Sequence, residues 1–243
     1  AVETRDEFLG VVSHDLRSPL SVILMATRAA ARQELAPPQA QLFQRIERSG
    51  RRLESIINLL LDFTRARLGS GIPVVLSAVT FHSICHEIVE EVRQANPGRE
   101  VLLEQHGNGE GRWDATRLGQ LVTNLVENAL KYSPEDSTVQ VVSRGEGDVV
   151  RLAVRNEGNP IPRAMVAKLF RPLQRADPTD QQAGTSLGLG LYVVHEIVRS
   201  HHGRIRVHSS AREGTTFEVT LGRGLPAARA DRGHRATEPV SQG

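Results

Sequence analysis

A run of apolar residues spaced alternately by four and three positions constrains the fold of this chain more than any other feature. The run comprises Leu42, Ile46, Leu53, Ile56, Leu60 and Phe63, with Ser49 as its one polar member. This heptad spacing is typical of a long helix that packs against other helices. We therefore predict a helix from Pro38 to Leu68 that can bury its apolar stripe only in a bundle.

A second amphipathic helix is predicted upstream of this run. Phe8, Val12, Leu16 and Leu20 recur at steps of four, which indicates a helix from Val2 to Arg32. The breaker "LAPPQ" then separates the two helices. Two long helices joined by a short loop form an antiparallel hairpin. Because a hairpin leaves one side of each stripe uncovered, we expect two chains to form a homodimeric four-helix bundle.

The pattern changes at "GSGIP", after which short strands and helices are mixed as far as residue 222. This mixture, with two predicted strand hairpins, indicates an α/β sandwich with much antiparallel pairing. We expect three parts: a helical hairpin (residues 1–70), an α/β domain (71–223) and a disordered tail (224–243). The predicted strands are 74–79, 101–103, 138–143, 149–156, 204–209 and 215–221, and the predicted helices of the α/β domain are 81–94, 115–132 and 187–200.

Composition narrows the class of protein. The 30 basic and 28 acidic residues nearly balance, so nothing in the charge favours a nucleic acid or an acidic membrane surface as partner. A single cysteine, Cys85, excludes an intramolecular disulfide and fits a reducing cytosol. No apolar run approaches the roughly 20 residues of a membrane span. We expect this portion to be cytoplasmic and, because it begins without an initiator Met, to follow a sensor or anchor that has been removed.

The octapeptide "SHDLRSPL" contains the first candidate for chemistry, His14. On a helix, His14 lies about 200° around the axis from Val12 and Leu16, so it faces away from the apolar stripe. An exposed imidazole beside a carboxylate, here Asp15, is the arrangement of a nucleophile with its base. Pro19 lets the helix bend one turn later. An ordinary surface histidine remains the alternative from these residues alone.

A polar stripe follows the predicted helix 115–132. Asn124, Glu127, Asn128 and Lys131 recur at steps of three and four, apart from the apolar positions. Asparagine oxygens are suitable ligands for Mg²⁺, and a lysine ammonium binds phosphate. The stripe therefore suits a metal-bound triphosphate, with a solvated helix face as the alternative.

Other candidates are weaker. His82 and His86 have a spacing that zinc can use, but no third ligand accompanies them, and Cys85 is expected on the core side. Asp114 is predicted to cap the helix that follows it, and His201 and His202 to lie at a helix end.

Five ordered motifs give the chain a family resemblance. "SHDLRSPL", "NLVENALKYS", "VRNEGNPIP", "LFRPLQR" and "GTSLGLGLYVVHEIVRSHHGRIRVHSS" resemble the H, N, G1, F and G2 boxes of bacterial two-component sensor histidine kinases, and "GTTFEVTLG" resembles the last strand of their catalytic domain. The resemblance covers about residues 5–222. It implies a dimerisation and phosphotransfer hairpin followed by an ATP-binding domain of the Bergerat fold.

The resemblance also implies a role for individual residues. His14 matches the phosphoacceptor and Asp15 the adjacent acid, while Asn128 is the expected Mg²⁺ ligand. Glu127 receives no catalytic role. Arg175 could equally be a solvated loop residue, and a glycine-rich run before a helix is by itself more often a turn. The implied nucleotide contacts are Asn124, Asn128, Lys131, Tyr132, Asn156, Gly158, Ile161, Arg175, Leu187, Gly188, Leu189, Gly190 and Thr216.

Several positions depart from the usual pattern of these kinases. Asn156 stands where Asp is common, and it can accept the same adenine hydrogen bond without charge. Pro160 replaces a usual Gly, as in a phytochrome-like subset. Ser186 and Leu173 also differ from frequent residues. Ser18 occupies a position implicated in phosphatase activity.

The resemblance implies an enzyme, a protein histidine kinase. It would use ATP and Mg²⁺ to phosphorylate His14 and pass the phosphoryl group to an aspartate of a response-regulator receiver domain. The alternative is a catalytically weakened ATP-binding dimerisation module or a phosphatase-biased regulator. The signal sensed, the cognate regulator and transfer within or between subunits stay open.

Overall fold

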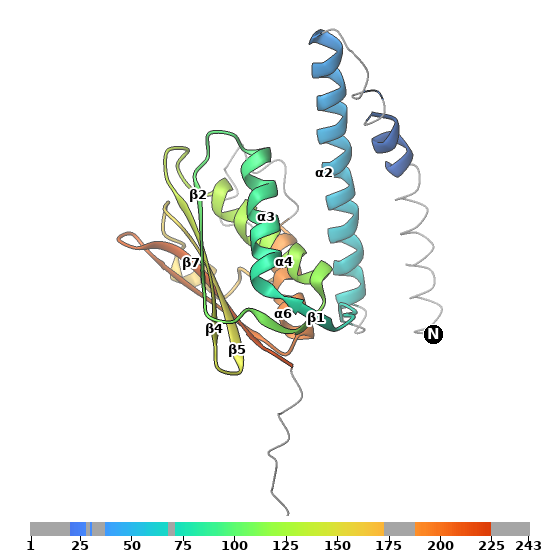
Figure 1. Ribbon diagram of the computed structural model, residues 1–243. Helices are drawn as coiled ribbons and strands as arrows, with labels where there is room; N and C mark the ends of the chain where they lie inside the picture. The colour runs from blue at the N-terminus through green and yellow to red at the C-terminus, as the bar shows by residue number, and fades with distance from the viewer. Residues whose placement is uncertain (1–19, 28–29, 31–36, 68–70, 173–187, 225–243) are drawn as a thin grey trace, which may run out of the picture.

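The computed structural model describes residues 20–27, 30, 37–67, 71–172 and 188–224. Residues 20–27 are helical and lie beside the long helix α2 (Pro37–Arg67) (Figure 1). Leu20 and Leu24 are buried with Ile57 and Leu61 of α2 in one small core. The helical pairing predicted from the sequence is thus confirmed for this stretch, and the rest of the predicted first helix lies outside the described residues.

Most of the heptad stripe of α2, before Phe63 at its end, lies off the face that packs within the hairpin. Leu42, Leu53 and Leu60 are exposed by 57%, 49% and 47%, whereas the buried Ile57 and Leu61 follow Ile56 and Leu60 by one position. One step along a helix turns the side chain by about 100°. The hairpin therefore uses one face of α2 and leaves Leu42, Ile46, Leu53 and Leu60 of the heptad stripe exposed.

The α/β domain follows, and its elements confirm the predicted fold class. Three helices, α3, α4 and α6, lie between the sheet and α2 in Figure 1. The elements are β1 (Ser77–Thr80), α3 (Phe81–Ala95), β2 (Val101–His106), β3 (Glu110–Trp113), α4 (Ala115–Lys131), β4 (Val139–Glu146), β5 (Val149–Asn156), α5 (Arg163–Val166), α6 (Gly190–Ser200), β6 (Arg204–Ser210) and β7 (Gly214–Gly222).

Five strands form the main sheet in the order β2-β4-β5-β7-β6, and β1 pairs with β3 in a separate ribbon. Only the β2–β4 pair is parallel; the β4–β5, β5–β7 and β6–β7 pairs are antiparallel. Alternate residues of β5 and β7 are buried against the helices, for example Leu152, Val154, Phe217 and Val219. The helices and this face of the sheet enclose one continuous apolar core.

Two elements were not predicted, and one strand begins later than expected. β3 has few apolar residues, and α5 is a single short turn. The predicted strand 74–79 begins only at Ser77, because the backbone N–H of Val75 donates to Asp114 Oδ2 (2.8 Å) rather than to a strand. The predicted Asp114 cap is confirmed, since Oδ1 accepts from Arg117 N (3.0 Å).

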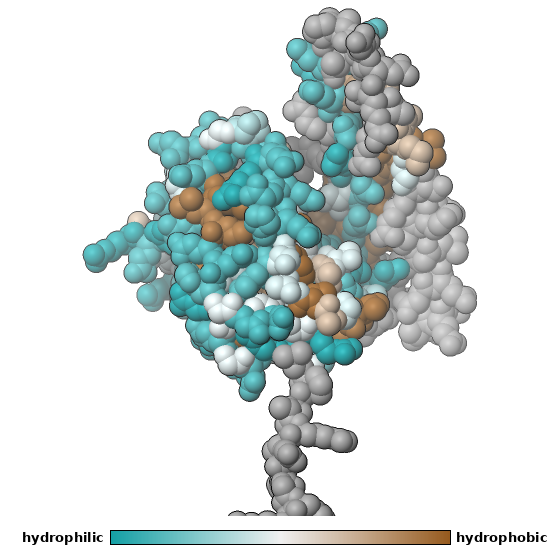
Figure 2. Space-filling model, viewed as in Figure 1, coloured by the Kyte–Doolittle hydropathy of each residue, from teal (hydrophilic) through white to brown (hydrophobic). Residues whose placement is uncertain are grey.

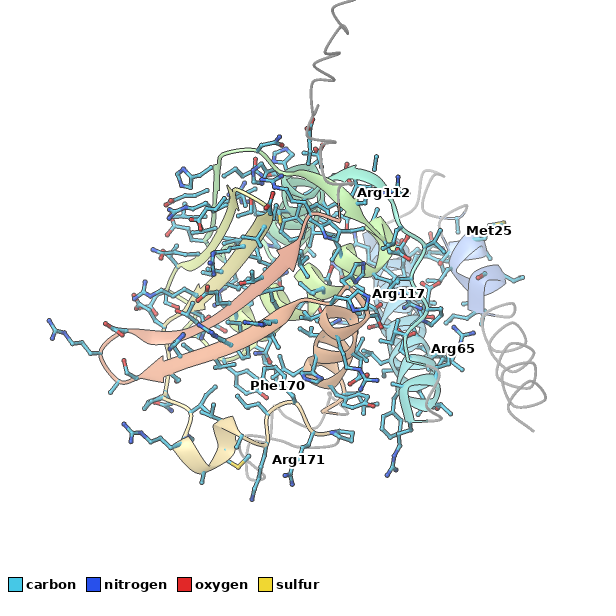
Figure 3. All side chains as sticks on the ribbon, turned by 90° about the horizontal axis from the view of Figure 1, so that it is seen from below. Met25, Arg65, Arg112, Arg117, Phe170 and Arg171 are labelled. Carbon is cyan, nitrogen blue, oxygen red and sulfur yellow. The ribbon has the colours of Figure 1, made fainter. Side chains whose placement is uncertain are left out.

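The end of α2 is bound to the α/β domain by polar and aromatic contacts. Asp62, 3% exposed, accepts from Arg117 Nη1 (2.9 Å) and from Gln120 Nε2 (2.8 Å) of α4. Phe63 packs edge to face on Tyr192 of α6, with ring centroids 5.6 Å apart. Figure 3 shows Arg117 at this junction. No helix in the described part of the chain combines the length and the apolar character that crossing a membrane requires.

Candidate functional site

Helix α4 separates its residues into a buried face and a polar face. Its buried residues are apolar and include Leu118, Leu121, Leu125 and Ala129. Asn124, Asn128 and Lys131 lie on the remaining surface and are partly exposed. The predicted polar stripe is therefore present on one helix, and the packing of the opposite face against the core holds it in place.

Asn124 is the residue of this stripe that lies against the beginning of α6. Its side-chain N–H donates to the backbone oxygen of Gln120 (2.8 Å). Its Oδ1 lies 2.8 Å from the position that a Cβ on Gly190 would occupy. Any side chain at position 190 would strike this oxygen, so glycine allows α6 to begin against α4. The first N–H groups of a helix lack partners within the helix and favour anions.

The other end of α4 meets the loop after β5. Gly158 has φ +151°, and a Cβ there would lie 2.3 Å from the backbone oxygen of Tyr132. Lys131 Nζ lies 5.0 Å from the centroid of the Tyr132 ring, which is 39% exposed. Gly158 therefore permits the close approach that places Lys131 and Tyr132 beside this loop.

Asn156 is the buried polar residue at the end of β5. It is 4% exposed, and its side-chain N–H donates to the backbone oxygen of Glu157 (2.9 Å). Because this bond uses the amide N–H, Oδ1 is the side-chain atom that can still accept a hydrogen bond. Gly214, with φ +73°, lies against the Asn156 backbone, where a Cβ would be 2.3 Å from the carbonyl oxygen.

The structure places Thr216 on the face of the sheet that the helices do not cover. In the β5–β7 register Thr215 is opposite Asn156, and both are buried on the face that the helices cover. Thr216 is opposite Arg155 and His208 on the other face of the sheet. Since successive residues of a strand point to opposite faces, Thr215 is the threonine on the side of the site.

Ser209 was not predicted, and it joins three segments. The backbone N–H of Ile161 donates to Ser209 Oγ (2.9 Å), and this hydroxyl shares a hydrogen bond with Thr215 Oγ1 (2.7 Å). Ile161 is thus placed through its backbone. The alternation of buried Phe217 and Val219 along β7 would have selected Thr215 from the sequence. The bond from Ile161 to Ser209 joins positions 48 residues apart in the chain and left no sequence signal.

The glycine-rich segment is described only from Gly188 onward. Gly188 has φ +67°, Leu189 is buried, and Gly190 begins α6. Phe170 of the predicted F box packs on His195 of α6, with ring centroids 5.5 Å apart, and Figure 3 shows Phe170 beside that helix. The remaining predictions, His14, Asp15, Ser18, Leu173, Arg175, Ser186 and Leu187, lie outside the described residues.

Two groups that receive no role in the site have raised pKa values. Desolvation raises the pKa of the Glu127 carboxyl, although the residue reaches solvent. Burial raises the pKa of Cys85 to about 12, against a weaker lowering by the hydrogen bond with Ser143. His82 Nδ1 is bonded to Ser143 Oγ (2.7 Å). Within the described residues, no group of three His, Cys, Asp or Glu side chains could hold a metal ion, so the zinc interpretation gains no support.

The arrangement has the chemistry of a nucleotide site. Two carboxamides and an ammonium from α4 lie along one stripe, α6 begins at one end of it, and a buried acceptor lies in the neighbouring sheet. Asparagine oxygen is a hard donor, and Mg²⁺ normally completes its ligands with water and phosphate oxygens. The residues present therefore fit a magnesium-bound nucleoside triphosphate.

Comparisons with known proteins agree with this geometry. Residues 113–225 match the family model described as Histidine kinase-, DNA gyrase B-, and HSP90-like ATPase, and residues 4–69 match the His Kinase A (phospho-acceptor) domain. Together the two models cover most of the chain, in the order in which the two parts occur.

The chain is also similar to individual proteins and to a solved structure. The chain is 31% identical over 231 residues to the circadian input-output histidine kinase CikA of Thermosynechococcus vestitus, covering 92% of this chain and 31% of that protein. It is 32% identical over 203 residues to a bacteriophytochrome of Pseudomonas aeruginosa, covering 84% and 28%. The crystal structure of full-length ShkA in complex with AMPPNP is similar, with TM-score 0.68 and 26% identity, covering 91% of this chain and 47% of that one. The chain thus spans about a third of the length of these two curated relatives.

Proposed function

This chain belongs to the two-component sensor histidine kinases and carries their catalytic core, and from that premise we propose that it transfers the γ-phosphoryl group of ATP to His14. The observation that supports this most is the polar stripe of α4, held between the beginning of α6 at Asn124 and the Gly158 loop at Tyr132. The same chain supplies both the nucleotide site and a histidine to receive the phosphoryl group.

The nucleotide would bind across α4 and the end of the sheet. Asn156 Oδ1 accepts from the adenine amino group, and Tyr132 covers the ring. Lys131 and the first amides of α6 bind phosphates. Asn128 would hold Mg²⁺, which neutralises phosphate charge when bound. Thr215 takes the place of Thr216 in this proposal, and Arg175 and Leu187 stay in it on the resemblance alone.

The reaction itself is an in-line transfer. A ring nitrogen of His14 forms a bond to the γ-phosphorus as the bond from that phosphorus to the bridging oxygen of ADP breaks. Asp15 holds the imidazole in the form whose attacking nitrogen carries no proton. The N–H of the other ring nitrogen stays on the side of the Asp15 carboxylate. Catalysis rests on position and on charge neutralisation.

A second copy of the chain is proposed to cover the heptad stripe of α2. The exposed Leu42, Ile46, Leu53 and Leu60 lie on a long helix whose other face is already used within the hairpin. Two hairpins joined along these stripes would make the four-helix bundle that the heptad predicts.

The phosphoryl group of His14 would then pass to an aspartate of a response-regulator receiver domain. We place this portion of the protein in the cytoplasm, where ATP is available. The boundaries at residues 70 and 223 and a sensor domain upstream remain parts of the proposal.

Radiolabelling tests the assignment. With γ-labelled ATP and Mg²⁺, the wild-type chain should acquire acid-labile label, and the His14→Gln variant should acquire none. Label that persists in the His14→Gln variant would exclude this phosphoacceptor. A wild-type chain that binds nucleotide without becoming labelled would favour a non-catalytic ATP-binding module instead.

Mixed dimers show whether the subunit that binds ATP phosphorylates its own His14 or that of its partner. Chains carrying His14→Gln are mixed with chains carrying Asn128→Ala, so that neither homodimer can be labelled. Label in the mixture requires transfer between subunits, whereas its absence, with heterodimers demonstrated, indicates transfer within one subunit.

A further inference from the structure

Arg99, in the loop between α3 and β2, binds the end of α4. Its Nη1 donates to the backbone oxygen of Leu130 (3.0 Å). Its Nη2 donates to Ser133 Oγ (2.7 Å) and to the backbone oxygen of Pro134 (3.1 Å). One guanidinium thus connects the last turn of α4 to the first residues that follow it.

These acceptors flank the two residues that the proposed function assigns to the nucleotide. Lys131 and Tyr132 lie between Leu130 and Ser133 in the chain. The Gly158 loop contacts the backbone oxygen of Tyr132. Arg99 and Gly158 therefore hold this short segment through different atoms.

The positive charge of Arg99 is favourable at the C-terminal end of α4. The last carbonyl groups of a helix lack partners within the helix and carry partial negative charge, which a cation stabilises. Pro134 O also accepts from Ser137 N (3.2 Å) and from Ser137 Oγ (2.8 Å), so the bond from Arg99 joins a turn that is already ordered.

One atom of Arg99 remains unsatisfied. Its Nε is buried and has no hydrogen-bond partner among the described residues. A buried donor without a partner is unfavourable. The three bonds to the end of α4 must offset this cost, which indicates that the position of the guanidinium is determined by that segment.

We propose that Arg99 is a positioning residue for the nucleotide: it sets the end of α4 so that Lys131 and Tyr132 meet the phosphate and the ring. The assignment rests on the proposed function, because it concerns the same nucleotide site. Arg99 need not touch the nucleotide.

Arg93 provides a matched control. Its Nε and Nη2 donate to the backbone oxygen of Val101 at 2.9 and 2.5 Å, so it also joins an arginine to a backbone carbonyl in the same part of the fold. Within the described part of the chain, its hydrogen bonds go to Val101 and Glu90 and not to α4. Arg99→Met and Arg93→Met each remove an arginine of this kind, and only the first removes the bonds to the end of α4.

The experiment measures binding of a non-hydrolysable ATP analogue with Mg²⁺ to the full chain by calorimetry, together with KM for ATP and kcat of autophosphorylation. Fluorescence of Trp113, the sole tryptophan of the chain, establishes a temperature at which every variant is folded. For Arg99→Met we expect Kd and KM to rise about tenfold while kcat falls less, as for other residues that orient a binding group. Arg99→Lys should recover part of the affinity, and Arg93→Met should stay within about twofold of wild type because its contacts are remote from the site.

Each result bears on a different claim. An Arg99→Met variant that binds as tightly as wild type, or no more weakly than Arg93→Met, would overturn the positioning role while the nucleotide site stands. A wild-type chain that does not bind the analogue would overturn the proposed function, and the role of Arg99 with it.

Discussion

The helical hairpin and the α/β domain bury their apolar residues to very different extents. Among the described residues, the hairpin buries four apolar residues in one core, Leu20, Leu24, Ile57 and Leu61, and exposes a stripe on α2. The described part of the α/β domain buries 26 residues in one cluster. Figure 2 shows a largely hydrophilic surface on the α/β domain, with smaller apolar areas.

This difference shows which region depends on a partner. The α/β domain buries most of its large apolar residues within one chain, so its fold should not vary with protein concentration. The hairpin leaves large apolar side chains in water, an arrangement that association of two copies would remove. Substitutions in the two regions should therefore have different consequences.

The largest effect is expected in the α/β domain. It should appear in the rate of autophosphorylation and not in the formation of the dimer. Asn128→Ala removes the proposed magnesium ligand from a partly exposed position of α4, so autophosphorylation should fall about 100- to 1000-fold, as for other single charge-stabilising groups. The dimer should persist, because Asn128 is remote from the heptad stripe. Labelling with γ-labelled ATP measures the first effect and light scattering the second.

Asn108→Ala is the matched control for that variant. Asn108 makes its side-chain contacts with Glu110 in an exposed turn. Equal loss of label in both variants would show that the effect is not specific to the α4 stripe.

The next effect should appear in the hairpin. Leu53→Asp places a charge on the proposed contact between two copies, and burying an unpaired charge there should weaken the dimer about 100-fold or more. Leu102→Asp makes the same change on the main sheet, at an exposure of 43% against 49% for Leu53. Sedimentation should show dissociation for Leu53→Asp alone; equal behaviour of the two variants would contradict the proposed role of the stripe.

Most of the fold could be predicted from periodicity, and the misses have physical causes. The strand Val149–Asn156 was predicted with its observed bounds, because the run is rich in strand-forming residues, and its apolar Val150, Leu152 and Val154 recur every second position. β3 was missed because its pairing with β1 depends on a buried Trp113 and on Gly111, which leaves that ring room. Local sequence carries no signal for such a contact.

The candidate site was predicted in part. The stripe of Asn124, Asn128 and Lys131 follows from helix spacing, and the structure confirms that these residues share one helix surface. Thr216 was predicted, whereas the two-residue period of β7 places Thr215 on the buried face with Phe217. Arg99 could not have been found, since its partners are about 30 positions further along the chain.

The contact between the two regions offers a third test. Asp62→Ala leaves Arg117 bonded to Gln120 but removes the buried acceptor on α2. We expect this to weaken the attachment of α2 to the α/β domain by about 1–2 kcal/mol, since the bond involves charged groups but Arg117 is partly exposed. A double-mutant cycle with Arg117→Ala isolates the pair.

Unfolding in urea measures that change through circular dichroism for the helices and through Trp113 fluorescence for the α/β domain. Arg51→Ala is the control, because the Arg51 side chain is 61% exposed and pairs with Glu47 on the same helix, and its loss should cost only about 0.5 kcal/mol or less. A coupling energy near zero for Asp62 and Arg117 would show that the two regions are held by their apolar contacts alone.

The smallest expected effect is a pH dependence confined to the α/β domain. Burial lowers the pKa of His201 below its usual value of 6.5, and nearby His202 adds to this, while the Ile197 carbonyl and Asp114 act in the opposite direction. Neutral His201 accepts from the backbone N–H of Asp114 through Nε2 (3.1 Å), with Nδ1 bonded to Ile197 O (2.8 Å). Protonation of Nε2 would remove that acceptor.

Because the folded-state pKa is lowered, the contribution of His201 to stability is complete above pH 6.5 and is lost as the pH falls through the folded-state pKa. The urea midpoint of wild type, followed by Trp113 fluorescence, should therefore fall more between pH 7.5 and pH 5 than that of His201→Gln, whose side chain cannot be protonated. His208→Gln, exposed on the other face of the sheet, should retain the wild-type dependence, since its ring has no comparable buried contact. If wild type and His201→Gln lose the same stability on acidification, the bond between α6 and the beginning of α4 does not depend on a neutral His201, and the pH response of this domain arises from other groups.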